Sequence, residues 1–191
     1  MSEDTMMIDK IVARARTAQA RYEAMGSQAL FDKACQAVAW VLMQPERNRA
    51  LAEMAVEETG LGNADDKVRK NHNKTLGLMR DIKDVTAFGH VEDDDENGLS
   101  IYYRPKGVIA AVVPSTNPLA TPVNNTINAL KTGNAIILAP SPKGVKPLLA
   151  LFEHIHPALA KLGLPEELVQ MVPAPPSKPK TERLMQLADL V

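Results

Sequence analysis

The sequence predicts an α/β fold in which a set of helices precedes part of a parallel sheet. Two patterns carry this prediction: apolar residues recur at helical spacing over the first ninety residues, and strand-like and helix-like segments alternate from Gly107 onward. Composition agrees, because 45% hydrophobic residues in a chain of 191 can build a sizeable core. We therefore expect a globular protein.

Charge and composition exclude several classes of protein. The 22 basic and 23 acidic residues give a formal net charge of -1, which provides no overall field to attract nucleic acid or an anionic membrane. Apolar runs stop well short of the roughly 20 residues of a membrane span, and the start of the chain lacks the pattern of a signal peptide. Cys35, the single cysteine, cannot form an intramolecular disulfide. We expect a cytoplasmic protein without nucleic-acid or membrane partners.

Four helices are expected first, because each apolar-periodic stretch lies between residues that start or stop helices. Gly26 and Gly60 are stop signals, whereas Ser27 and Asn63 are N-cap residues. Pro45 breaks the chain between the second and third helices. The expected ranges are 5–24, 27–43, 46–59 and 63–85.

A hairpin is expected next, around the Asn97-Gly98 pair, which lies between two short strand-like segments. The acidic run from Glu92 to Glu96 could hold a cation or lie on a solvated loop. We favour the solvated loop, because adjacent like charges repel and usually face water.

The rest of the chain predicts a parallel sheet with crossover helices. Strands are expected at 107–113, 134–139 and 168–172, and helices at 121–131 and 144–162. Ser177 caps a further helix with Pro179 in its first turn, and 188–191 begins another apolar run. Continuous apolar strands in this order indicate a sheet covered on both faces, with all carboxyl ends along one edge. Open α/β sheets bind ligands at that edge.

The end of the chain is unusual for such a sheet. The segment "LADLV" stops where a fourth strand would start, which would leave an edge unpaired. We expect these 191 residues to be the front part of a longer polypeptide.

Two turns at the ligand-binding edge are candidate sites. Asn117 follows the first strand between Pro114 and Pro118, and its amide could donate a hydrogen bond to an oxygen that gains negative charge. The alternative is that Asn117 only shapes the turn. Thr121 and Pro122 would then cap the next helix, whose N-terminus favours an anion.

The second turn runs from Ala139 to Gly144 and matches neither of the common glycine-rich phosphate motifs. Ser141 and the following helix N-terminus could hydrogen-bond a ribose or phosphate, with Lys143 supplying charge. A plain strand-to-helix connection would have the same sequence features, so both interpretations stay open.

The other reactive side chains are expected to have structural roles. Cys35 lies among Ala37, Val38 and Trp40 on an expected helix, which favours packing over nucleophilic chemistry. His154 and His156 are two residues apart on a helix and so point in different directions. We expect no metal site.

The segment "RPKGVIAAVVPSTNPLATPVNNTINALKTGNAIILAPSP" resembles the cofactor-binding region of the aldehyde dehydrogenase superfamily. "MAVEETGLGNADDKVRKNH", residues 54–72, is similar to a signature of its CoA-acylating branch, and "PSTNP" replaces the Pro-Trp-Asn-Phe-Pro of many hydrolytic members. The resemblance covers roughly residues 5–191. It implies an aldehyde dehydrogenase-like fold with a Rossmann-like parallel sheet, truncated before the catalytic domain.

By this resemblance, an aldehyde, coenzyme A and NAD or NADP would give an acyl-CoA and the reduced cofactor through a cysteine thioester. Asn117 matches the family's oxyanion donor. Ala139 stands where many hydrolytic members have a ribose-binding lysine, so NAD against NADP stays open, as does whether Lys143 substitutes. The family's nucleophile lies in a later domain, and Cys35 does not match it. The residues assigned to the cofactor are Pro114, Ser115, Thr116, Ala139, Pro140, Ser141 and Lys143.

The resemblance also implies an organisation of the chain. Residues 1–90 would form a helical segment, 91–106 an oligomerisation arm, and 107–191 a partial dinucleotide-binding domain, in an enzyme that is a homo-oligomer when complete. The substrate would be a short aldehyde, with a slight preference for sulfoacetaldehyde, or the corresponding acyl-CoA. An alternative is a non-catalytic nucleotide-binding or subunit-interaction module derived from such an enzyme.

Overall fold

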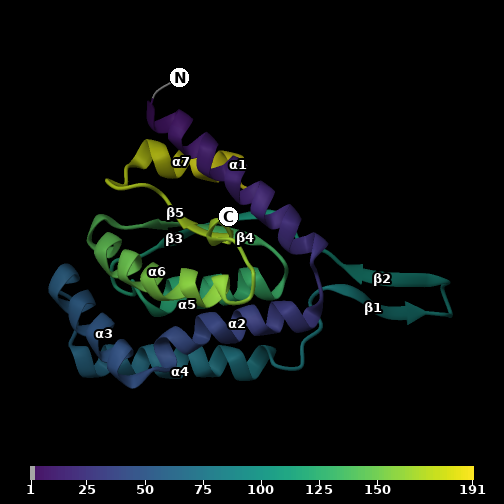
Figure 1. Cartoon of the computed structure of the whole chain (residues 1–191), viewed down its shortest axis with the longest axis horizontal. Coiled ribbons are helices and arrows are strands. Elements are labelled where there is room, and N and C mark those ends of the chain that lie inside the picture. The colour runs from purple at the N-terminus through teal and green to yellow at the C-terminus, as the bar shows by residue number, and fades with distance from the viewer. Residues whose placement is uncertain (1–2) are drawn as a thin grey trace.

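A computed structural model describes residues 3–191. It confirms the predicted order of helices, hairpin and parallel sheet, and Figure 1 shows the sheet between two sets of helices. The helices α1 and α7 lie on one side, whereas α5 and α6 lie on the other, with α2 and then α3 and α4 further out. The helical elements are α1 (Glu3–Ala24), α2 (Gln28–Met43), α3 (Pro45–Thr59), α4 (Ala64–Ile82), α5 (Ala120–Lys131), the 3-10 turn η1 (Pro142–Gly144), α6 (Val145–Ala160), η2 (Glu166–Leu168) and α7 (Lys178–Leu187).

Local capping chemistry places most helix ends where the sequence predicts them. The side chains of Ser27, Asn63 and Ser177 each accept a hydrogen bond from a backbone N–H in the first turn of α2, α4 and α7. Gly60 ends α3 in the left-handed conformation, with φ of 67°. The fourth helix is shorter than predicted. α4 ends at Ile82, whereas the prediction extended to Val85.

The predicted hairpin is formed by β1 (Gly89–Asp94) and β2 (Leu99–Tyr103), which pair antiparallel and project from the body of the molecule (Figure 1). Asp94 stabilises the turn, since its Oδ1 accepts a hydrogen bond of 3.1 Å from the backbone N–H of Asn97. Most side chains of the acidic run from Glu92 to Glu96 are exposed, as predicted for a solvated loop.

The parallel sheet consists of β3 (Val108–Val113), β4 (Ala135–Pro140) and β5 (Val169–Met171), in the order β3-β4-β5. Leu190 forms a parallel bridge with Ile109 on the other side of β3. The N–H of Ala110 donates to the carbonyl of Leu190 at 2.8 Å. The apolar run at the end of the sequence therefore begins to pair next to β3, as its sequence suggests.

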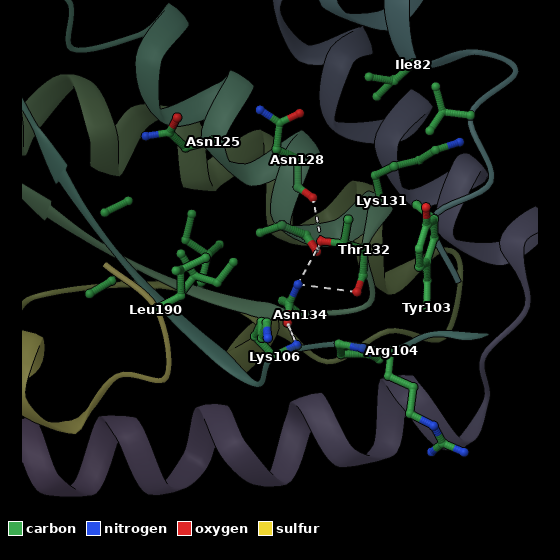
Figure 2. Close-up of a pocket in the computed structure, with 18 of the residues that line it drawn as sticks. Ile82, Tyr103, Arg104, Lys106, Asn125, Asn128, Lys131, Thr132, Asn134 and Leu190 are labelled. Carbon is green, nitrogen blue, oxygen red and sulfur yellow. Dashed lines mark hydrogen bonds between the residues drawn. The ribbon is translucent and has the colours of Figure 1, made fainter. Parts of the chain in front are cut away.

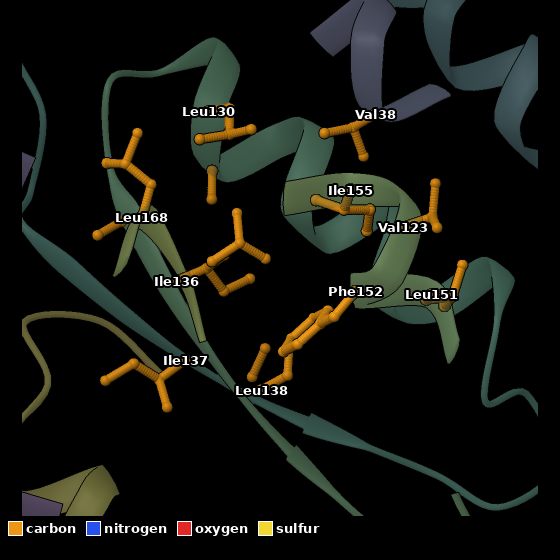
Figure 3. Packing of buried hydrophobic residues seen from close by; sticks show 14 of the residues in the cluster. Val38, Val123, Leu130, Ile136, Ile137, Leu138, Leu151, Phe152, Ile155 and Leu168 are labelled. Atoms are coloured by element: carbon orange, nitrogen blue, oxygen red, sulfur yellow. The ribbon is translucent and has the colours of Figure 1, made fainter. Parts of the chain in front are cut away.

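The core is one continuous cluster that includes residues from the N-terminal helices and from the sheet (Figure 3). Ile136, Ile137 and Leu138 of β4 are fully buried, because β4 has strands on both sides and helices on both faces. Burial of each such side chain stabilises the fold by about 1.5–3 kcal/mol. Tyr22 of α1 donates from its hydroxyl to the carbonyl of Leu130 at 3.1 Å. The predicted boundary at residue 90, between the helical segment and the rest of the chain, stays a prediction.

Asn134 fixes the start of the sheet. Its Oδ1 accepts hydrogen bonds from the N–H groups of Lys106 and Gly107, at 2.7 and 2.8 Å. Its Nδ2 donates to Oγ1 of Thr132 at 2.7 Å. The side chain thereby joins the residues before β3 to those before β4, so both strands begin in register.

Candidate functional site

The candidate site lies at the carboxyl edge of the sheet. β3 lies between β4 and Leu190 in the sheet. Segments that follow β3 in the sequence therefore pair on both of its sides. In open α/β sheets, a reversal of this kind opens a crevice beyond the carboxyl ends of the strands. The predicted turns follow β3 and β4 at this edge.

The two turns contact each other. The N–H of Ser141, after β4, donates to the carbonyl of Val113, the last residue of β3, at 3.1 Å. Space is also tight at Gly144, where an added Cβ would lie 3.2 Å from Oγ of Ser141 and 3.6 Å from Cβ of Pro118. The fold therefore brings together residues that are more than twenty positions apart in the sequence.

Asn117 is half-buried in the first turn, which its N–H closes by donating to the carbonyl of Pro114 at 3.3 Å. Its Nδ2 donates to Oγ1 of Thr121 at 2.8 Å, which orients the amide. A carboxamide carries two N–H donors, so one is left for an incoming oxyanion. The position and orientation are compatible with the predicted chemistry.

The expected cap of the next helix is wrong. α5 begins at Ala120 with Leu119 in the N-cap position, and no side chain caps it. Thr121 instead lies inside the first turn, where its hydroxyl accepts the hydrogen bond from Asn117. Pro122 is tolerated there, because an N–H in the first turn has no partner within the helix.

The second turn offers fewer side chains than predicted. Ala139 and Pro140 are buried within β4, so they expose little surface to a ligand. Oγ of Ser141 is buried and has no hydrogen-bond partner within residues 3–191. An unsatisfied buried hydroxyl is costly, which makes Ser141 the side chain of this turn best placed to gain from a ligand.

Lys143 points toward another part of the molecule. The residue is exposed in η1, and its Nζ lies 3.5 Å from the carbonyl of Thr59 at the end of α3. A cation at a helix C-terminus is stabilised by the helix dipole. The structure therefore gives this lysine a local role that the sequence pattern did not indicate.

The remaining predicted residues of the first turn are accessible. Pro114 and Thr116 are exposed, and Ser115 is half-buried. Thr116 also lines a cavity of about 160 Å³ against the start of α4, together with Lys67 and Lys70. These two lysines were not predicted as site residues, although two basic residues three positions apart near a helix start were a visible signal.

A much larger cavity lies elsewhere, on the face of the sheet beside α5 (Figure 2). It measures about 1200 Å³, and its lining includes Asn125 and Asn128 of α5, Thr132 just after that helix, and Leu190. Neither Asn117 nor Ser141 lines it. We therefore place the candidate site by the chemistry of the two turns and not by cavity size.

Cys35 is buried in the core, as predicted, with 1% of its surface exposed. Its Sγ donates to the carbonyl of Ile127 at 3.3 Å. Burial, and to a smaller extent the charge of Asp32, raises the pKa of the thiol to about 12. Such a thiol is almost wholly protonated near neutral pH, so it cannot act as the nucleophile.

Residues 3–191 contain neither a membrane-spanning helix nor a cluster of metal-ligating side chains. None of the helices there has the length and apolar character that crossing a membrane requires. No three of the histidine, cysteine, aspartate and glutamate side chains in this part of the chain gather closely enough to hold a metal ion.

Comparison with known proteins gives consistent matches. Residues 2–187 match the model of the aldehyde dehydrogenase family. A sulfoacetaldehyde dehydrogenase (acylating) of Cupriavidus necator is 55% identical over 95% of this chain and 36% of its own length. A succinate-semialdehyde dehydrogenase (acetylating) of Clostridium kluyveri is 38% identical over 96% of this chain and 40% of its own length.

Solved structures agree. An acetylating aldehyde dehydrogenase from Geobacillus thermoglucosidasius has a TM-score of 0.89 at 31% identity, over 97% of this chain and 41% of its own. A propionaldehyde dehydrogenase of Rhodopseudomonas palustris, with bound CoA and an acylated cysteine, has a TM-score of 0.79 at 34% identity, over 93% of this chain and 39% of its own. The chain thus spans about two fifths of the length of these four proteins.

Proposed function

The chain belongs to the aldehyde dehydrogenase family, and from that premise we propose that it forms the cofactor-binding part of a CoA-acylating aldehyde dehydrogenase. The reaction converts a short aldehyde, coenzyme A and NAD or NADP to an acyl-CoA and the reduced cofactor. We assign the chain to the acylating branch because relatives named as acylating or acetylating match nearly the whole chain.

This reaction would use a cysteine thiolate that adds to the aldehyde carbonyl, NAD or NADP as the acceptor of hydride, and coenzyme A as the acceptor of the acyl group. Asn117 would donate its remaining amide N–H to the carbonyl oxygen while that oxygen is negatively charged. The nucleophile would come from outside these 191 residues, since Cys35 is the single cysteine and is buried.

One observation carries the proposal: the Asn117 turn and the Ser141 turn follow neighbouring strands at the edge where the sheet reverses direction, and the N–H of Ser141 bonds Val113, the strand residue just before the first turn. Ser141 offers a buried hydroxyl without a partner in the described residues, and a ribose or phosphate oxygen would satisfy it. We assign Ser141 to the adenosine half of the cofactor, beside Ala139 and Pro140 of β4. Lys143 would supply charge there by leaving the carbonyl of Thr59. Pro114, Ser115 and Thr116 would contact the cofactor from the Asn117 turn.

Titration calorimetry of the chain with NADH, NADPH and coenzyme A tests this proposal. We expect Ser141→Ala to weaken binding of the preferred dinucleotide about fivefold, the value of one hydrogen bond. Ser100→Ala, on the exposed hairpin, is the matched control and should bind as the unaltered chain does. No binding of any of the three ligands would refute the proposal, whereas binding that Ser141→Ala leaves unchanged would refute only the residue assignment.

The buried Cys35 is equally compatible with a second function. Because that thiol is buried with a raised pKa, the 191 residues hold no usable nucleophile, which suits a non-catalytic nucleotide-binding or subunit-interaction module. The mass of the natural protein separates the two functions. A mass near 20.8 kDa supports the module. A larger protein whose additional part contains a cysteine supports the enzyme.

The substrate is proposed from the comparisons, and the mode of assembly from the exposed surface of the hairpin. Sulfoacetaldehyde is our first candidate, because the relative at 55% identity carries that name. The hairpin would serve as an oligomerisation arm, since Leu99 and Tyr102 of β2 expose 58% and 59% of their surface. The homo-oligomer and the cytoplasmic location stay predictions, which sedimentation and cell fractionation would test.

A further inference from the structure

A small cavity beside the Asn117 turn carries two lysines without acidic partners. It is lined by Lys67 and Lys70 of α4, by the loop before that helix, and by Thr116, the residue that directly precedes Asn117. Its volume of about 160 Å³ exceeds the roughly 30 Å³ that one water occupies in the liquid, so it can hold an oxyanion group.

The charges of the two lysines are not neutralised by the protein. Neither Lys67 nor Lys70 forms an ion pair or a side-chain hydrogen bond within the described part of the chain. Asp66 also lines the cavity, but its carboxylate already accepts hydrogen bonds from Arg69 and from Nδ2 of Asn63. The cavity therefore keeps an excess of positive charge.

The position of Lys67 makes this excess costly. The side chain is half-buried, and its Cε lies 3.9 Å from where a Cβ on Gly62 would be. Burial, and then the neighbouring charge of Lys70, lowers the pKa of Lys67. The N-terminus of α4 adds further positive potential. A bound anion would offset the positive potential that Lys70 and the helix N-terminus create at Lys67.

We propose that Lys67, Lys70 and the hydroxyl of Thr116 form an anion subsite that binds an oxyanion group of a substrate while the reacting carbonyl lies at Asn117. The group is a sulfonate or carboxylate on the aldehyde, or a phosphate of coenzyme A or the dinucleotide. The inference rests on the proposed function, because Asn117 must mark the reacting centre.

Sulfate is the probe for the subsite. The backbone amide shifts of the chain are followed by NMR while sodium sulfate replaces sodium chloride at constant ionic strength. We expect saturable shifts at Lys67, Lys70 and Thr116, and an affinity about tenfold lower in Lys67→Gln/Lys70→Gln, because hydrogen bonds to charged groups are the stronger kind. Lys67→Arg/Lys70→Arg should keep the affinity.

A matched control separates the subsite from net charge. Lys10→Gln/Lys83→Gln removes the same two charges, from α1 and from a position about 24 Å along α4 from Lys67. We expect this variant to bind sulfate as the unaltered chain does. Equal affinity in the Lys67→Gln/Lys70→Gln variant, or shifts confined to another face, would overturn the subsite.

Competition identifies the source of the anion. If 2-hydroxyethanesulfonate displaces sulfate at lower concentration than ADP does, the subsite binds the acid group of an aldehyde, and the reverse order assigns it to a phosphate. Displacement by neither would overturn the substrate role. NADH binding is measured on the same samples, because its absence from the unaltered chain refutes the proposed function, whereas lysine-independent sulfate binding refutes the subsite alone.

Discussion

Among single residues, Asn117 is the one whose side chain would act on the reacting atoms. In an enzyme that joins this chain to a domain with the nucleophilic cysteine, we expect Asn117→Ala to lower turnover about a hundredfold or more. The reason is that the amide N–H would stabilise charge that develops only in the transition state. Steady-state kinetics with the preferred aldehyde would measure turnover. NADH binding to the same variant would measure cofactor affinity separately.

Asn128→Ala is the control for Asn117→Ala. Asn128 is an exposed asparagine of α5 that lies away from both turns, so its replacement should leave turnover within a factor of about two. Equal turnover in the two variants would remove Asn117 from the mechanism. A large loss of NADH affinity in Asn117→Ala would instead indicate a role in binding.

Gly107 is a residue where backbone conformation and space both require glycine. Its φ is +129°, and a Cβ added there would overlap Oδ2 of Asp189. That oxygen accepts a hydrogen bond from the N–H of Val108 and forms an ion pair with Arg16, so moving it would break both interactions. We expect Gly107→Ala to lower the free energy of unfolding by about 3 kcal/mol in urea denaturation.

Gly98→Ala isolates the contribution of backbone conformation. Gly98 also has a positive φ, +66°, but nothing lies within 4 Å of an added Cβ. We expect a loss of about 1 kcal/mol, the cost of the left-handed conformation alone. Similar losses in both variants would show that Asp189 moves aside without cost.

Between elements, Asn134 connects the segment before β3 to the segment before β4. Replacing it by alanine leaves the N–H groups of Lys106 and Gly107 without their acceptor. We expect Asn134→Ala to destabilise the chain by about 2 kcal/mol, because two hydrogen bonds from partly buried donors are lost. Urea denaturation followed by circular dichroism would measure this loss.

Thr132→Val tests the other half of the same junction. It removes the hydroxyl that accepts from Nδ2 of Asn134 but leaves the two bonds accepted by Oδ1 in place. We expect a smaller loss, of about 1 kcal/mol. A larger loss for Thr132→Val than for Asn134→Ala would mean that the junction does not depend on Oδ1.

Elements were predictable from sequence where their ends depend on local chemistry. Ser27, Asn63 and Ser177 cap their helices as predicted, because an N-cap bond involves only neighbours in the chain. Thr121 was predicted as a cap and is not one, since its hydroxyl bonds the side chain of Asn117 in the preceding turn. The last strand is shorter than predicted, because Leu168 belongs to η2.

The site was predictable in part for the same reason. The order of strands and turns places Asn117 and Ser141 at one edge, which the structure confirms. The contact of Lys143 with Thr59 and the cavity between Thr116 and the lysines of α4 depend on how distant segments pack. Periodicity and spacing carry no information on such contacts.

Across the whole molecule, one core joins the N-terminal helices to the sheet. Cys35 of α2 lies in this core, and its thiol bonds the carbonyl of Ile127 in α5. A boundary near residue 90 would allow the helices to open while the sheet stays folded. A shared core instead favours a single cooperative unfolding transition.

Labelling of Cys35 by a thiol reagent decides between these two behaviours. Because burial raises the pKa of the thiol to about 12, we expect labelling at pH 8 to be slower than in the unfolded chain by roughly a thousandfold or more. Its dependence on urea should coincide with loss of the circular dichroism signal. The double variant Cys35→Ala/Ser100→Cys, with an exposed thiol on β2, should react at once without urea. If Cys35 reacts at urea concentrations where the circular dichroism signal is intact, the N-terminal helices open on their own, and the boundary at residue 90 has a physical basis.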